Sequence, residues 1–351
     1  MEVLRGGVEP DLMVSGLSVE SQSLANRCRR LEFSDRGEKQ ATITLYEPNF
    51  NVEHCSYIPV SPSRLAGREG RGFLQHLTSA RMEVDEENPM MEKPQYREWE
   101  ERSDRQGMGW VCHETGSFRS HVLGMWCMVG GERSLIRVKV PGERGSGTHE
   151  ELDSKDFYFS TGLIEEGLGK GIRFPMFGPS LMVEYPRDKL ELYGEDREMP
   201  ARMIFFKYKP GYRMFSMGSQ LPMNEKHFSY ISRASGMPRD VLLEGSVTWP
   251  MAILGLIHSM GVSLQNECHI ANFELSEDGI YRYVPDFGVA KRGLTESDML
   301  DERDRLLDQL GEWYIQRSCF RGLGGSQAML LKSKGMRAYE GGAAFFRGSG
   351  Q

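Results

Sequence analysis

Three side chains in the C-terminal third of the sequence have types that suit phosphoryl chemistry. Glu267 and Asn272 lie five residues apart (272 − 267 = 5), and Asp286 follows 14 residues later (286 − 272 = 14). Phosphoryl transfer needs a carboxylate that orients the attacking hydroxyl, an amide that holds a metal ion, and a second carboxylate for the metal that bridges the phosphates. The sequence supplies these three residue types in that order.

Two earlier segments hold residues that suit phosphate binding. Lys139 closes an alternating apolar segment, and the two-residue period of a strand places it on the same face as Arg137, from which it can reach a phosphate. An edge lysine whose charged end stays in water has the same pattern. Gly116 and Ser117 lie in the loop Thr115–Val122, where small residues let backbone N–H groups approach a phosphate, although an ordinary turn also contains such residues.

Taken together, these segments resemble the protein-kinase-like superfamily over roughly residues 110–314. Thr115–Val122 resembles the glycine-rich loop, and Ile136–Lys139 resembles the strand that carries the phosphate-binding lysine. Lys207–Gly211 is similar to the hinge between lobes, and Asp286-Phe-Gly288 is similar to the metal-binding motif.

The resemblance implies that ATP and Mg²⁺ are the cofactors. Gly116, Ser117 and Lys139 would hold the nucleotide, and Asn272 and Asp286 would hold the metal ion. A helix expected within residues 150–170 would supply a carboxylate partner for Lys139. A partner in the middle or later part of that helix favours Glu165 or Glu166, although its acidic residues also fit a solvated helix face.

The catalytic loop departs from the pattern of protein kinases, which is H-R-D-L-x-x-x-N. Glu267 stands where that pattern has aspartate, and Gln265-Asn266 replace His-Arg. His269 is similar to the second histidine in the H-G-D-x-H-x-x-N loop of aminoglycoside and choline kinase-like enzymes, where it would contact the transferred phosphate. A packed or capping imidazole is the alternative. No Ala-Pro-Glu follows, which is more similar to small-molecule or atypical kinases.

The surrounding pattern predicts strands first and helices later. Alternating or β-branched segments predict strands within 12–52 and at 121–129, 135–140, 181–185 and 203–208. Helical spacing predicts helices at 240–260, bent or split at Pro250, and at 301–314, with a short hairpin at 273–284 between them. The predicted fold class is therefore α+β, and the resemblance implies a bilobal protein-kinase-like fold. It has an antiparallel N-lobe sheet, a mainly helical C-lobe and an extra strand-containing N-terminal region.

Three regions are predicted along the chain. Residues 1–105 would form the N-terminal region and a linker, for which a long insertion within one domain is the alternative. Residues 106–211 would form the N-lobe and hinge, and residues 212–351 the C-lobe and tail.

The composition narrows the classes of partner. The 351 residues carry 43 Lys and Arg against 50 Asp and Glu, a net charge of −7, which argues against nucleic acid or an anionic membrane as the main partner. Six scattered cysteines form no disulfide framework, and the N-terminus has no apolar signal segment. We therefore expect a soluble protein that is cytoplasmic or otherwise intracellular.

These observations predict an ATP- and Mg²⁺-dependent phosphotransferase. Glu267 would orient the hydroxyl of a small-molecule or protein acceptor, with His269 beside it. One alternative is a catalytically dead pseudokinase that serves as a nucleotide-binding or scaffold protein. Another is a structural or assembly protein whose N-terminal region docks a protein partner.

Overall fold

The computed structural model describes residues 17–24, 27–35, 38–49, 120–129, 132–139, 154–184, 202–209, 211–216, 221–311 and 325–348. Gly116, Ser117 and the predicted linker lie outside these ranges. The chain divides into two compact units. Unit 1 comprises Met1–Glu86, Met91–Phe157 and Gly178–Tyr208, and unit 2 comprises Glu87–Met90, Tyr158–Phe177 and Lys209–Gln351.

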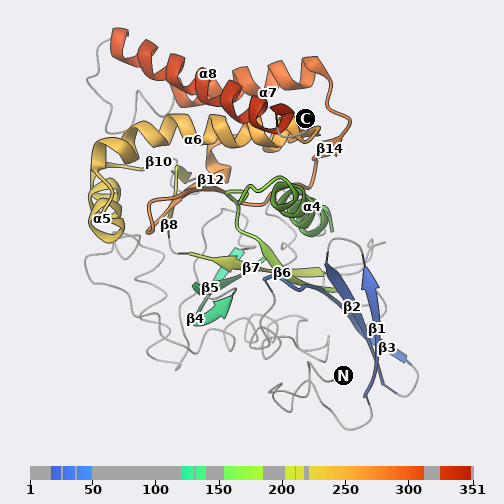
Figure 1. Cartoon of the computed structure of the whole chain (residues 1–351). Helices are drawn as coiled ribbons and strands as arrows, with labels where there is room; N and C mark the ends of the chain where they lie inside the picture. The colour runs from blue at the N-terminus through green and yellow to red at the C-terminus, as the bar shows by residue number, and fades with distance from the viewer. Residues whose placement is uncertain are drawn as a thin grey trace, which may run out of the picture. The chain divides into compact units, whose positions relative to one another are not determined.

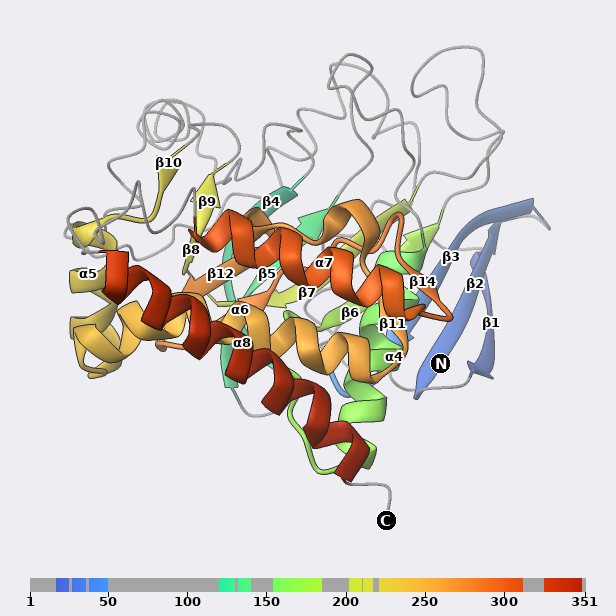
Figure 2. The same ribbon diagram turned by 90° about the horizontal axis from the view of Figure 1, so that it is seen from above.

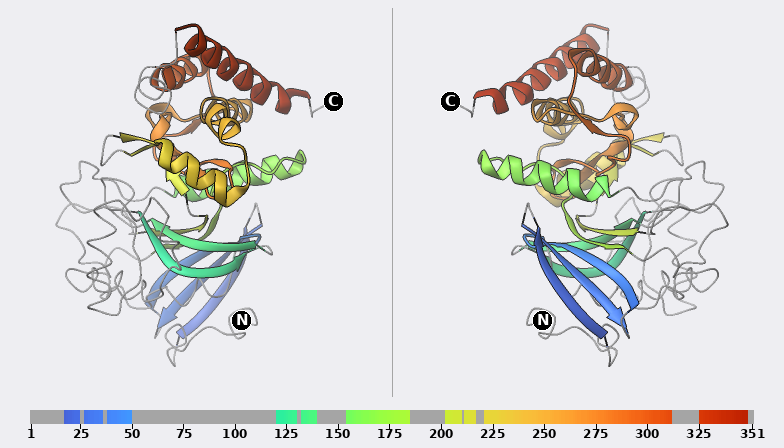
Figure 3. Two further views of the ribbon diagram at one scale, coloured as in Figure 1. Left: turned by 90° about the vertical axis from the view of Figure 1, so that its left-hand side faces the viewer. Right: turned by 90° about the vertical axis from the view of Figure 1, so that its right-hand side faces the viewer.

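Unit 1 contains a seven-stranded antiparallel sheet in the order β1-β2-β3-β6-β7-β5-β4 (Figures 1 and 3). Its strands are β1 (Leu17–Leu24), β2 (Cys28–Asp35), β3 (Glu38–Tyr46), β4 (Ser120–Val129), β5 (Glu132–Lys139), β6 (Pro179–Glu184) and β7 (Arg202–Tyr208).

The first three strands extend the same sheet that holds the strand of Lys139. β3 pairs antiparallel with β6, with Thr42 opposite Glu184 and Leu45 opposite Leu181. This pairing joins segments far apart in the chain, because β3 ends at Tyr46 and β6 begins at Pro179. Residues 17–46 are therefore part of the unit 1 sheet.

β5 and β7 set the position of Lys139 within the sheet. They pair antiparallel, with Lys139 opposite Ile204 and Arg137 opposite Phe206. Directly opposed residues lie on the same face of a sheet. Lys139 and Arg137 therefore share a face with two apolar side chains that are buried at 0% and 3% exposure.

Helices dominate unit 2, which also has short strands. The helices are α5 (Glu225–Ser235), α6 (Arg239–Ser259), α7 (Glu296–Asp308) and α8 (Gly325–Gly348). The strands are β8 (Gly211–Arg213), β9 (Phe215–Ser216), β10 (Leu221–Pro222), β11 (Val262–Ser263), β12 (Phe273–Ser276), β13 (Tyr281–Tyr283) and β14 (Lys291–Arg292). A further helix, α4 (Lys155–Gly169), begins in unit 1 and continues into unit 2.

α6 is the central apolar helix of unit 2. Met251, Ile253, Leu254 and Ile257 on it are fully buried, and the helix runs without a break through Pro250. It is long and apolar enough to cross a membrane by length and composition, but 61% of its apolar window is buried inside the protein. A core helix passes the same test, so the membrane and localisation predictions stay predictions.

α8 packs along α6, and the two helices lie side by side in Figures 1 and 2. Glycines make this contact close. A Cβ added to Gly255 would meet the backbone of Tyr339, and one added to Gly342 would meet the backbone oxygen of Ala252. Larger side chains at these two positions would force the helices apart.

A three-stranded sheet in the order β13-β12-β8 lies next to the segment 265–272, because β12 begins directly after Asn272. The β12–β13 hairpin turns at Gly279, whose φ of 79° lies in the left-handed region that glycine adopts without strain. β8 pairs with β12, and Arg213 lies opposite Glu274.

The structure confirms the predicted hairpin at 273–284, the strands at 203–208 and 181–185 to within two residues, and the helix at 240–260. Of the two outcomes predicted at Pro250, the split is wrong, because α6 is one helix, and the bend stays a prediction. α7 begins earlier than predicted because Thr295 caps it: its side chain accepts from Asp298 N, and Asp298 bonds back to Thr295 N.

The observed α+β architecture, with an antiparallel sheet and several helices, is compatible with a kinase-like fold. The predicted boundary at 105–106 lies outside the described residues, and the three predicted domains stay a prediction.

Candidate functional site

Lys139 makes a buried ion pair in unit 1. Its Nζ lies 2.6 Å from Oδ2 of Asp156, in the first turn of α4. The side chains are 11% and 3% exposed, so both charges are largely removed from water. An ion pair that is this short and this well shielded from solvent fixes the position of the ammonium group on the sheet face.

The carboxylate partner differs from the predicted one. We expected Glu165 or Glu166, but α4 begins at Lys155, so its first turn, rather than its later turns, carries the acid that meets Lys139. Glu166 instead lies 3.6 Å from Arg292, and both Glu165 and Glu166 are partly exposed. The predicted helix also contained Asp156, about two and a half turns before the two glutamates that we favoured.

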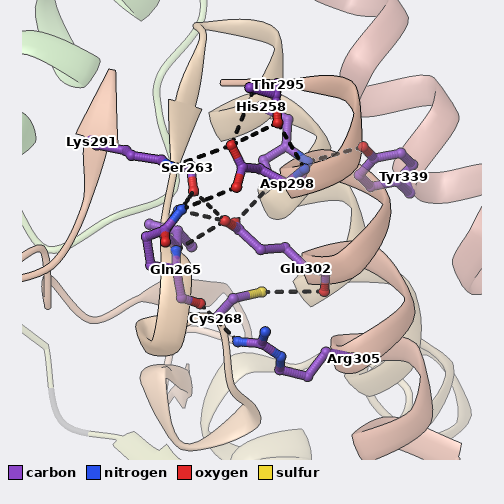
Figure 4. A network of polar contacts seen from close by, with 11 residues as sticks. His258, Ser263, Gln265, Cys268, Lys291, Thr295, Asp298, Glu302, Arg305 and Tyr339 are labelled. Carbon is purple, nitrogen blue, oxygen red and sulfur yellow. Dashed lines mark hydrogen bonds and ion pairs between the residues drawn. The ribbon is translucent and has the colours of Figure 1, made fainter. Parts of the chain in front are cut away.

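In unit 2, the segment that precedes Glu267 is anchored to α7 through one carboxylate (Figure 4). Glu302 Oε2 accepts from the backbone N of Leu264 at 2.9 Å, and Oε1 accepts from the backbone N of Gln265 at 2.9 Å. The hydroxyl of Ser263 also donates to Oε1. Three consecutive residues are therefore held by a carboxylate that is 2% exposed.

The anchor continues beyond Glu302 into two more helices. His258 Nε2 on α6 lies 3.0 Å from Glu302 Oε2, and His258 Nδ1 lies 2.9 Å from the hydroxyl of Tyr339 on α8 (Figure 4). Arg305 donates to the carbonyl of Gln265 at 3.0 Å. Gln265 has a φ of 54°, which is unfavourable for a residue with a side chain. The bonds at its N–H and C=O hold this strained residue in place.

The pKa values of two groups in this network are shifted, those of the Glu302 carboxyl and the Cys268 thiol. Burial acts to raise the pKa of Glu302, but the hydrogen bonds from His258, Ser263, Leu264 and Gln265 outweigh it and hold that pKa below its ordinary value. Burial, together with the Glu302 charge, raises the pKa of the Cys268 thiol well above its ordinary value. Cys268 is therefore a buried structural thiol rather than a nucleophile.

Glu267, His269 and Asn272 lie together after the anchored segment. Asn272 Nδ2 donates to the carbonyl of Glu267 at 3.0 Å and lies 3.4 Å from its Oε2. His269 Nε2 lies 3.6 Å from the same Oε2 and 3.5 Å from Asn272 Nδ2. The structure thus brings together three of the residues that the sequence singled out.

A residue that the sequence analysis missed completes this cluster. Arg213, on β8, donates from Nη1 to the carbonyl of Ala271 and, at 3.3 Å, to Oδ1 of Asn272. Its Nε lies 3.9 Å from Oε2 of Glu274, which is fully buried. Arg213 is distant in sequence from the loop, and only the pairing of β8 with β12 brings it there.

Asp286 follows the β12–β13 hairpin. The backbone N of Val284 donates to the carbonyl of Asn272 at 2.8 Å, and the hydroxyl of Tyr283 donates to the carbonyl of Asp286 at 2.9 Å. Phe287 is fully buried and stacks on Phe159 of α4, with ring centroids 5.7 Å apart. Asp286 itself is half-buried beside this aromatic anchor.

Of the two residues predicted to bind Mg²⁺, only Asp286 fits that role well. Among the described residues, no group of three or more His, Cys, Asp or Glu side chains could hold a metal ion. Mg²⁺ in nucleotide sites is usually bound by one or two carboxylates together with phosphate oxygens, and Asp286 fits that role. Asn272 fits less well, because its oxygen faces the cationic Arg213.

No protein-family model matches the sequence, and no curated protein matches it. Among solved structures, the chain is similar to aerobactin synthetase from a hypervirulent pathotype of Klebsiella pneumoniae. The identity is 12% and the TM-score 0.39, over 74% of this chain and 52% of that chain. This chain therefore spans about half of the synthetase.

The chain is also similar to a Toxoplasma gondii rhoptry antigen kinase domain, with 12% identity and a TM-score of 0.35. The match covers 69% of this chain and 82% of that domain. Similarity at this level carries no information on activity.

Proposed function

We propose that the protein is an ATP- and Mg²⁺-dependent phosphotransferase that acts on a hydroxyl group of a small molecule or a protein. The observation that carries the proposal is the cluster of Glu267, His269 and Asn272 behind a segment that Glu302 anchors. Phosphoryl transfer relies mainly on positioning and electrostatics, and a strained, anchored loop supplies a fixed position.

In this proposal, Glu267 orients the acceptor hydroxyl and accepts its proton. Its side chain is 24% exposed, so it remains accessible to a ligand while Asn272 and His269 limit its movement. His269 contacts the transferred phosphate. The His269 side chain is 27% exposed, so a ligand can reach part of the imidazole ring.

Lys139 and Asp286 act on the nucleotide. Lys139 holds the phosphates, and Asp156 takes the place in which we expected Glu165 or Glu166, keeping the ammonium oriented. Asp286 would hold a Mg²⁺ ion, which would supply positive charge to the phosphates. Gly116 and Ser117 remain candidates for backbone contacts to the phosphates.

The second candidate is a nucleotide-binding pseudokinase. The contacts of Glu267 with Asn272 and His269 favour it, because they turn the carboxylate toward its own loop. The protein would then bind nucleotide without transferring phosphate, as a scaffold or binding module.

One experiment separates the two candidates. Purified protein is incubated with Mg²⁺ and γ-labelled ATP, with and without a panel of hydroxyl acceptors, and its melting temperature is measured with and without nucleotide. A phosphotransferase shows ATP-dependent stabilisation and label transfer or ATP turnover. Stabilisation without turnover indicates the pseudokinase, and the absence of both contradicts the two candidates together.

A further inference from the structure

The amide oxygen of Asn272 is engaged by an arginine, although the kinase resemblance assigns a metal ion to it. Arg213 Nη1 lies 3.3 Å from Asn272 Oδ1 and also donates to the carbonyl of the preceding residue, Ala271. A guanidinium group has five N–H donors and no acceptor. The oxygen of Asn272 therefore meets a fixed cation in this conformation.

The other side of the carboxamide confirms its orientation. Asn272 Nδ2 faces the carbonyl of Glu267 at 3.0 Å and its carboxylate Oε2 at 3.4 Å, and both are acceptors. Rotating the amide by half a turn would place its oxygen against these two acceptors and its NH₂ group against Arg213. The hydrogen-bond network therefore admits one orientation, with Oδ1 toward Arg213.

Arg213 has little freedom to leave. Its side chain is 7% exposed, and Glu274, whose carboxylate lies 3.9 Å from Arg213 Nε, is 0% exposed. The antiparallel pairing of β8 with β12 places these two residues opposite each other. Withdrawing the arginine would break its ion pair with the buried Glu274 carboxylate, which is unfavourable.

We propose that Arg213 excludes a divalent cation from Asn272, so that the chain binds its nucleotide with a single metal ion, at Asp286. Asn272 then acts as a positioning residue that ties Arg213 to Glu267. A Mg²⁺ ion at Oδ1 would have to displace the guanidinium or share the oxygen with another cation. This inference rests on the proposed nucleotide-binding function and specifies its metal stoichiometry.

The test counts metal ions on the full chain. Mn²⁺ is titrated into an equimolar mixture of protein and a non-hydrolysable ATP analogue, and bound Mn²⁺ is measured by the loss of the free-ion electron paramagnetic resonance signal. The analogue alone gives the reference. We expect one bound Mn²⁺ per complex in the natural protein, and about tenfold weaker binding or worse of that ion in Asp286→Asn.

A charge-neutral double variant tests the role of Arg213 directly. Arg213→Met with Glu274→Gln removes both members of the buried pair, which is far milder than removing one of them. We expect this variant to bind a second, weaker Mn²⁺ per complex, and its melting temperature shows whether it is folded. A folded double variant that still binds one ion would contradict exclusion by Arg213.

The natural protein also provides outcomes that need no variant. Two Mn²⁺ ions per nucleotide complex would overturn this inference and leave the proposed function standing. A chain that binds neither the nucleotide nor Mn²⁺ would overturn the proposed function, and this inference with it.

Discussion

Asp156 Oδ2 accepts a hydrogen bond from Lys139 Nζ at 2.6 Å, and this pair joins the end of β5 to the first turn of α4. The two groups are among the most buried charges of unit 1, at 2% and 9% exposure of the whole residues. The contact fixes the ammonium group of Lys139 on the sheet face that also carries Arg137 and the buried side chains of Ile204 and Phe206.

Lys139→Met should therefore destabilise the protein even without nucleotide. The change leaves Asp156 as a buried charge without its lysine, and breaking one member of such a pair typically costs about 3–5 kcal/mol. Chemical denaturation of the variant measures this loss. The double variant Lys139→Met/Asp156→Leu should recover most of the stability, and an equally unstable double variant would contradict the pairing.

Nucleotide binding should also depend on the ammonium group of Lys139. In the stabilised double variant, we expect no ATP-dependent rise in melting temperature, because the ammonium group is absent. A rise equal to that of the natural protein would remove Lys139 from the nucleotide site.

Glu302→Gln should loosen the segment 263–265, which the carboxylate holds. Three donors of this segment, Ser263 Oγ and the N–H groups of Leu264 and Gln265, converge on the Glu302 carboxylate, and an amide presents an NH₂ group to at least one of them. Leaving a buried donor unsatisfied costs about 1–3 kcal/mol. Differential scanning calorimetry should show a lower melting temperature. Asp301→Asn, at an exposed position on the same helix, is the matched control and should melt like the natural protein.

The stability of the protein at acidic pH should also depend on Glu302. Its pKa is lower in the folded protein than the ordinary value of 4.5, so its ionised form favours folding above that value. This contribution is lost as the pH falls from about 4.5 through the folded pKa. Melting temperatures from pH 7 to pH 3 should fall more steeply in the natural protein than in Glu302→Gln at the acid end. Parallel curves would contradict the assigned direction of the shift.

The β12–β13 hairpin and the two ends of α6 were predictable, because their signals are local. Apolar spacing marks α6, and Gly279 within a polar turn marks the hairpin. α8 was missed because Gly335, Gly341 and Gly342 lower its helix propensity. Two of these glycines permit the close approach to α6 that stabilises the helix in the folded protein.

The cluster of Glu267, His269 and Asn272 was predictable, because these residues lie within one short loop. Arg213 and Glu302 were not, since strand pairing and helix packing bring them to the loop from distant segments. For Asp156, the choice among the acids of α4 depended on where that helix begins. The pairing of β3 with β6 joins the N-terminal strands to the rest of the unit 1 sheet. No local sequence pattern predicts this pairing.

Glu267→Gln tests the assignment of the general base. The amide keeps the size of the side chain and loses the basic oxygen, so turnover should fall by about 10²-fold or more. Nucleotide affinity should stay nearly unchanged, since the proposal assigns Glu267 to the acceptor hydroxyl and not to the nucleotide. Turnover that is unchanged in Glu267→Gln would exclude this residue from the mechanism. Glu267→Asp should slow an active enzyme, because the shorter side chain sits back from the acceptor, whereas a gain of activity would favour the pseudokinase.

The most direct test of the account is calorimetric titration of ATP with Mg²⁺ into the natural protein and into Asp286→Asn. The variant removes one negative charge with little change of shape, so the proposed metal ligand is lost while Phe287 can keep its packing. We predict saturable binding to the natural protein and at least tenfold weaker binding to the variant, equivalent to about 1.4 kcal/mol. Equal affinity in the two proteins, or no binding to either, would contradict the proposed nucleotide–metal site.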